Sequence, residues 1–277
     1  MLKKKFLIFP IILILTFSCG NNDGLIKKPE KVPPLDILYK TAFRLYEEGS
    51  WSEAIDLFQK VETKYSFSEW APRATLMVMY IYYESSEYYQ ALEYANKYKK
   101  LYPSSKNITY VDYLIGLVFY EQISTVARDQ TYTKEALKKF NELIDNNPNS
   151  IYAKEAKYKI DLINEQLAGK EMYLARYYMK KSKWVAAIKR LNIILDKYEQ
   201  TVYVPEALHR LVEIYYKLGN LNQASKYGAI LGYNFNDDEW YKKSYKIVAD
   251  KDYSTEKKAQ KIKFRDKIKK IFNFTEW

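Results

Sequence analysis

Apolar side chains in the segment 35–68 recur at the spacing of amphipathic helices. Two such helices can bury their apolar faces against each other, with these residues at the interface: Leu38, Leu45, Ile55, Phe58 and Val61. Small residues stand at fixed offsets, since Gly49 follows Ala42 by seven positions and Ala54 follows Gly49 by five. The alanines allow the helices to approach closely, and the glycine permits a left-handed turn between them. The segment therefore predicts an antiparallel helix pair.

The same frame returns along the chain, which indicates a repeat protein. The alanine expected in the second helix of each pair stands at positions 54, 91, 136, 187 and 224. With a 34-residue pair as the unit, this predicts an all-α tetratricopeptide-repeat superhelix of about five helix pairs with a concave face. The repeat domain is expected at 35–240, with units at about 35–68, 72–105, 108–150, 151–201 and 205–238.

Some units depart from the frame of the first one. Ser86 and Ser182 stand at turns where the first unit has a glycine. In the third unit Gly116 and Ala136 are twenty positions apart, against twelve for the equivalent pair of the first unit, so about eight residues are inserted in the stretch EQISTVARDQT. The segment 151–181 contains no proline and keeps a helical period, so it predicts one long helix.

The first residues have the pattern of a secretion signal. Lysines at positions 3–5 precede an apolar run, Phe6–Phe17, that is too short to cross a bilayer. A small residue then precedes Cys19, the only cysteine of the chain, which is the arrangement that bacterial lipoprotein processing uses. We predict a lipoprotein signal peptide over 1–18, a covalent lipid on Cys19 and a flexible tether over 19–34. The alternative is an ordinary signal followed by an incidental cysteine.

Composition restricts the chemistry that the chain can perform. Its 45 Lys and Arg against 34 Asp and Glu give +11, and loss of the signal lysines leaves +8. A single cysteine and a single histidine exclude a disulfide framework and a zinc site of Cys and His, and they argue against a histidine-activated nucleophile. Phosphate-loop, dinucleotide and HExxH motifs are absent. We expect no enzyme, no metal or other cofactor, and no nucleic-acid partner for an exported chain. His209 is expected to lie in ordinary helix packing or on a helix surface, and Asp237–Glu239 to start a helix.

Two segments carry more aromatic or basic residues than a helical core needs. The run YIYYESSEYY at Tyr80–Tyr89 places tyrosines on more than one helix face, so it is either core or a surface that binds an aromatic-rich extended peptide. Residues 241–277 are expected to form a basic amphipathic extension, whose part from Lys251 onward has a net charge of +5. That part can lie on a membrane, dock on a partner or be a solvated helix.

Several stretches, in order, carry a resemblance to one family. They are ILYKTAFRLYEEGSWSEAI (37–55), KYSF (64–67), LYPSSKNITYVDYLIGL (101–117), RDQTYTKEALKKFNELIDNNPNSIYAKEA (128–156) and WVAAIKR (184–190). Together they resemble the BamD family of the outer-membrane β-barrel assembly machinery. The resemblance extends from Cys19 to about Trp240, and the chain departs from it at Ser66, where the family has a proline.

The resemblance implies a non-enzymatic, lipid-anchored subunit on the periplasmic side of the bacterial outer membrane. It implies that the C-terminal repeats bind the POTRA domains of BamA, with Trp184 and Arg190 at the contact. It also implies that the N-terminal repeats bind the β-signal of unfolded outer-membrane proteins, with Tyr65, Phe67 and Tyr83 in the groove. The charge of Arg190 suits a partner carboxylate. The alternative for Arg190 is ordinary helix surface, and for Tyr65 a purely structural role.

Two other functions fit a periplasmic repeat protein. One is a scaffold for cell-division or peptidoglycan enzymes, and the other is a tether that binds cell-wall polymer through the basic extension. Depletion of the protein separates the assembly role from a division role. Loss of barrel proteins with normal cell shape indicates assembly, whereas filamentation with normal barrel proteins indicates division.

Overall fold

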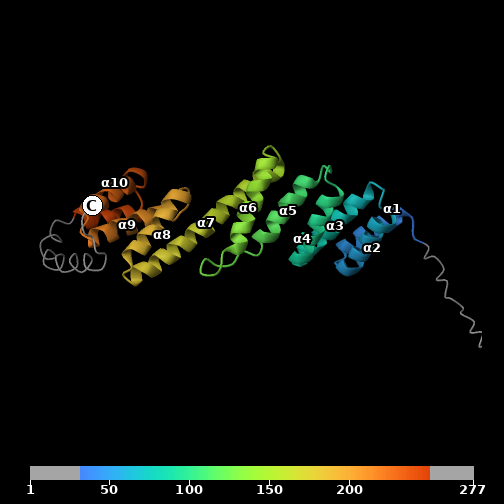
Figure 1. Cartoon of the computed structure of the whole chain (residues 1–277), viewed down its shortest axis with the longest axis horizontal. Coiled ribbons are helices and arrows are strands. Elements are labelled where there is room, and N and C mark those ends of the chain that lie inside the picture. Colours follow the sequence, from blue (N-terminus) through green and yellow to red (C-terminus); the bar gives the residue numbers. More distant parts are fainter. Residues whose placement is uncertain (1–31, 250–277) are drawn as a thin grey trace, which may run out of the picture.

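The computed structural model describes residues 32–249, so the expected signal peptide, Cys19 and the extension beyond Ala249 lie outside the described residues. Within that range the chain is all-helical, as predicted (Figure 1). The helices are α1 (Leu35–Glu47), α2 (Trp51–Lys64), α3 (Trp70–Glu84), α4 (Tyr88–Leu101), α5 (Ile108–Tyr120), α6 (Thr131–Asn146), α7 (Ile151–Lys180), α8 (Trp184–Lys197), α9 (Val204–Lys217), α10 (Leu221–Asn234) and α11 (Glu239–Ala249).

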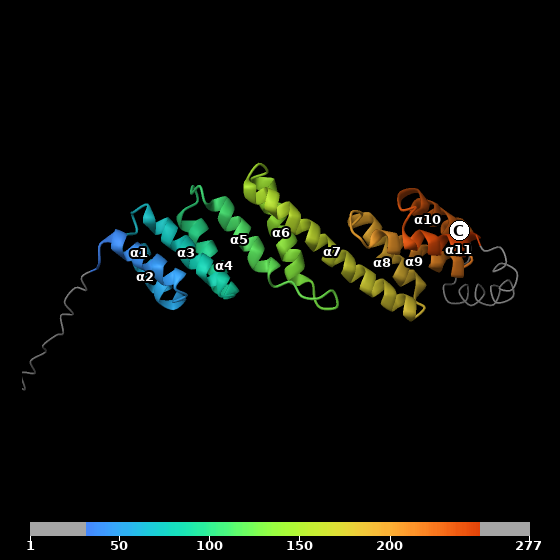
Figure 2. The same cartoon turned by 180° about the vertical axis from the view of Figure 1, so that it is seen from behind.

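Consecutive helices pack in pairs that stand side by side in an elongated row (Figure 1, Figure 2). The small residues lie where the pattern predicts them, since Ala42 and Ala54 are fully buried between α1 and α2 together with Phe58. Helix α11 follows the fifth pair and packs against α9 and α10. Each pair thus contacts its neighbours in the row, which is the architecture of a helical repeat array.

Left-handed residues make the turns inside four of the pairs. Gly49 and Gly219 both have φ of +78°, while Ser86 and Ser182 have φ of 61° and 55°. The two serines therefore occupy the backbone conformation that the glycines occupy, as their positions in the repeat predict. A serine there carries a steric cost that glycine does not.

Gly116 decides how closely α5 and α6 approach. A Cβ atom built on Gly116 would overlap the ring of the fully buried Phe140 on α6. The ring fills the space that the missing side chain leaves, so the glycine serves packing here and not backbone conformation.

The predicted long helix exists as α7, and it joins the part of the row formed by α1–α6 to the part formed by α8–α11. Helix α7 has 30 residues, and the Ser150 hydroxyl caps its start by accepting a hydrogen bond from the Ala153 amide. Its first half buries Ala156 and Ile163 in the core shared with α6. Its second half buries Met172 and Ala175 in the core shared with α8 and α9. Relative placement of the two parts therefore depends on this helix.

The middle of α7 is held from two sides. The insertion of the third unit, residues 121–130, lies against it, because Gln166 donates to the Ser124 carbonyl and Lys170 donates to the carbonyls of Ala127 and Arg128. A Cβ on Gly169 would meet Val126 from this loop and Tyr203 from the start of the fifth unit. The insertion thus ties the third unit to the helix of the fourth.

Helix α11 is anchored on α9 by the one histidine. His209 is 3% exposed, and its Nδ1 lies 2.8 Å from the Ser244 hydroxyl. Its ring packs against Trp240 with centroids 5.0 Å apart. Of the two expectations for His209, helix packing or helix surface, the structure shows packing. The Asp238 carboxylate accepts from the Trp240 amide at 2.7 Å, so the acidic cluster does start a helix.

Among residues 32–249, no helix is both long and apolar enough to cross a membrane. The same residues contain no group of histidine, cysteine and acidic side chains placed to hold a metal ion.

Candidate functional site

The first helices of successive pairs form one layer of the row, since α1 contacts α3, α3 contacts α5 and α5 contacts α7. Aromatic side chains run across this layer. We call them the inner tyrosine surface, and its members are Phe43, Tyr46, Tyr80, Tyr83, Tyr110, Tyr113 and Tyr152. Its tyrosines are half-buried, and Phe43 is exposed. The surface therefore offers ring faces and hydroxyls to solvent while the rings support one another.

Neighbouring rings of the surface touch across helix boundaries. Tyr46 of α1 and Tyr80 of α3 have centroids 6.3 Å apart, and Tyr80 lies at the same distance from Tyr83. Tyr152 at the start of α7 lies 5.3 Å from Tyr110 and 5.5 Å from Tyr113, both on α5. These are the separations of favourable aromatic pairs.

One carboxylate organises the first part of this surface. Glu84 accepts a hydrogen bond from the Tyr80 hydroxyl at 2.8 Å and from the Tyr46 hydroxyl at 3.1 Å. Burial, and then the hydrogen bond to Glu84, raise the pKa of Tyr80 and Tyr46 above the ordinary tyrosine value. Burial is also the main reason that the pKa of Tyr83 and that of Tyr110 rise to about 12. All four phenols are neutral in a neutral buffer. The hydroxyls of Tyr46 and Tyr80 donate to Glu84 and can still accept a hydrogen bond from another molecule.

The predicted groove residues lie at opposite ends of helix α3. Tyr83 belongs to the inner tyrosine surface, near the C-terminal end of α3. Tyr65 and Phe67 lie in the turn before α3, which spans 15 residues and so separates them from Tyr83 by roughly 20 Å. The structure therefore does not bring the three residues into one site.

Tyr65 and Phe67 have different surroundings. The Tyr65 hydroxyl donates to the Pro33 carbonyl at 2.8 Å, and the Tyr65 ring packs against the core formed by α1, α2 and α3. This contact fixes the segment just before α1 on the end of α2. Phe67 is fully exposed, so it is free to meet another molecule.

Trp184 and Arg190 both lie on α8 but have different roles in the packing. Trp184 packs against the core formed by the second half of α7 with α8, α9 and α10, and the Lys217 ammonium lies 5.4 Å from the Trp184 ring centroid. The Arg190 guanidinium lies 3.0 Å from the Glu171 carboxylate of α7, and a third of its side chain remains exposed. Arg190 is thus accessible and already paired.

A second charged network joins α7 and α9. Arg176 of α7 forms two hydrogen bonds to the carboxylate of Glu206, which also accepts from Arg210 at 3.2 Å. Burial raises the pKa of the Glu206 carboxyl, but the two arginines outweigh it and hold the pKa below its ordinary value. Glu206 therefore links the fourth and fifth units as an ion.

The sequence contained a signal for the inner tyrosine surface beyond Tyr83. Tyr46 and Tyr80 are 34 positions apart, one repeat, and Tyr113 follows Tyr80 by 33. Residues at one repeat spacing occupy equivalent faces of successive helices. Repeat-spaced tyrosines on first helices therefore mark the surface.

Comparison with known proteins agrees with the family resemblance. The family profile YfiO, described as an outer membrane lipoprotein, matches residues 33–230. The outer membrane protein assembly factor BamD of Caulobacter vibrioides is 40% identical over 241 residues, which cover 86% of this chain and 79% of the relative. BamD of Rickettsia prowazekii is 37% identical over 237 residues, with coverage of 86% and 94%. BamD of Neisseria meningitidis serogroup A is 30% identical over 244 residues, with coverage of 83% and 91%. The BamD proteins are thus relatives of this chain, which belongs to the YfiO/BamD family of outer membrane lipoproteins.

Proposed function

We propose that the chain is a non-enzymatic subunit of the complex that assembles β-barrel proteins into the bacterial outer membrane. Relatives at 37% and 40% identity over most of the chain are named as assembly factors, which supports this role. A lipid on Cys19 would hold the repeats on the periplasmic face of that membrane, with 20–34 as the tether.

The observation that carries the proposal is the inner tyrosine surface. A β-signal is an extended segment with alternating aromatic side chains. Half-buried rings at about 6 Å intervals can stack on such side chains. The neutral hydroxyls around Glu84 can hydrogen-bond the backbone of an extended segment, which has no internal partners. The first three units therefore bind the unfolded substrate.

The C-terminal units bind the periplasmic POTRA domains of BamA. The exposed part of the Arg190 guanidinium can donate hydrogen bonds to a second carboxylate, from the partner, while it remains close to Glu171. Trp184 lies at the start of the same helix and supplies an apolar contact beside Lys217. The proposed substrate surface thus lies in the part of the row before the middle of α7, and the proposed BamA contact lies in the part after it.

Affinity purification of the full-length lipoprotein from detergent-solubilised envelopes tests the assignment to the complex. We expect a POTRA-containing barrel protein in near-equal amount, identified by mass spectrometry. Recovery of division or cell-wall enzymes without that protein would contradict the proposal and support the scaffold alternative.

A labelled peptide that corresponds to the C-terminal ten residues of an outer-membrane barrel protein and ends in Phe tests the tyrosine surface. Replacement of both Tyr80 and Tyr83 by alanine is expected to weaken binding about tenfold, because each aromatic pair contributes about 0.5–1.5 kcal/mol. Tyr89→Ala is the matched control, since this exposed tyrosine lies on α4, outside the inner tyrosine surface, and its hydroxyl donates to Glu93. Equal affinity for all variants would remove the surface from the substrate site.

A further inference from the structure

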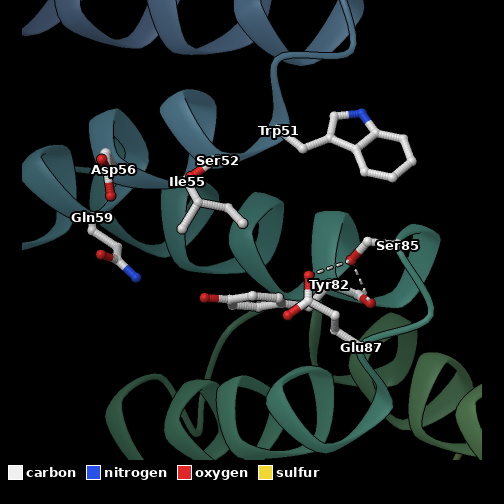
Figure 3. Close-up of a pocket in the computed structure, with 8 residues that line it drawn as sticks. All are labelled: Trp51, Ser52, Ile55, Asp56, Gln59, Tyr82, Ser85 and Glu87. Carbon is white, nitrogen blue, oxygen red and sulfur yellow. Dashed lines mark hydrogen bonds between the residues drawn. The ribbon is translucent and has the colours of Figure 1, made fainter.

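A pocket of about 310 Å³ opens between the first and second helix pairs (Figure 3). Helix α2 supplies Trp51, Ile55, Asp56 and Gln59 to its lining, and the end of α3 and the following turn supply Tyr82 and Glu87. The pocket therefore lies in the seam where the two repeats pack.

This pocket is separate from the inner tyrosine surface. Tyr82 and Tyr83 are adjacent on α3, and successive helix residues point about 100° apart. The Tyr82 ring packs 5.5 Å from Tyr94 of α4, whereas Tyr83 packs 6.3 Å from Tyr80. The pocket thus opens on another side of α3, and a molecule bound there is not the substrate segment proposed above.

The polar groups in the pocket are mainly hydrogen-bond acceptors. Asp56 and Glu87 are exposed carboxylates in the lining. Glu87 accepts only from neutral groups there, the Ser85 hydroxyl at 3.2 Å and the Gln90 amide at 3.1 Å. The Gln59 amide donates to the Tyr94 hydroxyl at 2.7 Å, which leaves its carbonyl oxygen to accept.

The remaining walls are aromatic and aliphatic. Trp51 and Tyr82 are half-buried, and Ile55 is 9% exposed. Burial of its ring is the main cause that raises the pKa of Tyr82, and Tyr94, Glu87 and Asp56 raise it further. The charged side chains that line the pocket are thus both carboxylates, in a chain whose net charge is +11.

We propose that this pocket binds the arginine side chain of a protein partner. A guanidinium has only donors, which matches a lining of acceptors, and its flat face stacks on tryptophan and tyrosine. Its three-carbon stem is apolar and fits against Ile55. Lysine fits less well, because its ammonium is compact, strongly hydrated and does not stack.

Fluorine NMR of the full chain in detergent micelles, with 5-fluorotryptophan at its five tryptophans, tests the proposal. Trp51→Phe identifies the Trp51 resonance. The probe is the capped tripeptide Gly-Arg-Gly, compared with peptides that contain lysine or the neutral isostere citrulline. We expect the arginine peptide to shift the Trp51 resonance saturably, the lysine peptide to do so more weakly, and the citrulline peptide to leave it unchanged.

The double variant Asp56→Asn and Glu87→Gln is expected to bind the arginine peptide about tenfold more weakly, since an exposed ion pair contributes up to about fivefold. Glu53→Gln is the matched control, because this exposed carboxylate lies on α2 and does not line the pocket. Equal binding of citrulline or lysine, an unmoved Trp51 resonance, or an unchanged affinity in the double variant would each overturn the proposal.

Discussion

The Arg190 guanidinium of α8 lies 3.0 Å from the Glu171 carboxylate of α7. The residue proposed to meet a partner carboxylate thus has a carboxylate of its own chain beside it. Replacement of Arg190 can therefore act through the fold or through the partner, and a pair of variants separates the two causes.

We predict that Arg190→Gln weakens the complex with the POTRA-containing partner, whereas Glu171→Gln leaves it equal or tighter. The second substitution removes the internal competitor and leaves the guanidinium available. Each variant removes the same internal ion pair, whose loss costs about 1 kcal/mol or less at this exposure. Co-purification yield and thermal melting measure the two effects. If both variants lose the partner equally, Arg190 acts only through Glu171.

Gly116→Ala is expected to destabilise the repeats by about 1–3 kcal/mol, because the new methyl group overlaps the Phe140 ring in a packed core. Thermal or urea unfolding measures the change. Gly228→Ala is the control, since a Cβ there makes only ordinary contacts at 3.7 and 3.9 Å and gains about 1 kcal/mol of helix propensity. Gly116→Ala combined with Phe140→Leu should recover part of the loss. A neutral Gly116→Ala would mean that α6 can shift away from α5 at little cost.

Ser86→Gly and Ser182→Gly are each expected to raise the melting temperature. A left-handed residue other than glycine costs about 1–2 kcal/mol, of which the greater freedom of glycine in the unfolded chain offsets about 0.4–1 kcal/mol. The reciprocal change Gly49→Ser should lower the melting temperature, because it places a side chain at φ of +78°. Differential scanning calorimetry of the three variants gives the signs. A fall for either serine variant would show that its side chain contributes more than the strain removes.

The docking of α11 is expected to weaken in mild acid. Burial lowers the pKa of His209 below its ordinary value of 6.5, nearby Glu213 and Glu206 oppose this shift, and Arg210 and Lys243 add to it. Below pH 6.5 the unfolded histidine binds a proton that the folded one resists, so stability falls as the pH drops from 6.5 toward the folded pKa.

Hydrogen exchange of residues 239–249 at pH 7.5 and pH 5.5 measures this effect. His209→Gln keeps a polar group near Ser244 but cannot titrate, so its exchange protection should change less between the two pH values. A pH dependence that is the same in both proteins would assign it to other groups.

Local patterns were sufficient to predict the helix pairs, the turns, the long α7 and the small residues at close approaches. These features depend on hydrophobic period, on the steric limits of φ and on side-chain volume, which act over one repeat or less. For His209 the sequence left helix packing and helix surface open, and the burial of its ring decides for packing. The lipid on Cys19 and the role of the extension beyond Ala249 stay predictions, because they lie outside the described residues.

The site depended on contacts that join residues far apart in the chain. Tyr46 meets Tyr80 across one repeat, and Tyr110 meets Tyr152 across another, so the ring surface exists only when the pairs are stacked. The separation of Tyr65 from Tyr83 likewise follows from the direction in which α3 runs between them.

The sequence by itself therefore determined the repeat and its turns, because backbone sterics and hydrophobic period are local. The family was indicated by the resemblance of several ordered stretches of sequence. Tertiary structure alone decided that Arg190 pairs with Glu171, that the loop 121–130 holds α7, and which tyrosine rings of neighbouring helices touch one another. The reason is that the neighbour of a side chain on a helix depends on how that helix rotates against the next one, and the packing of the whole row sets that rotation.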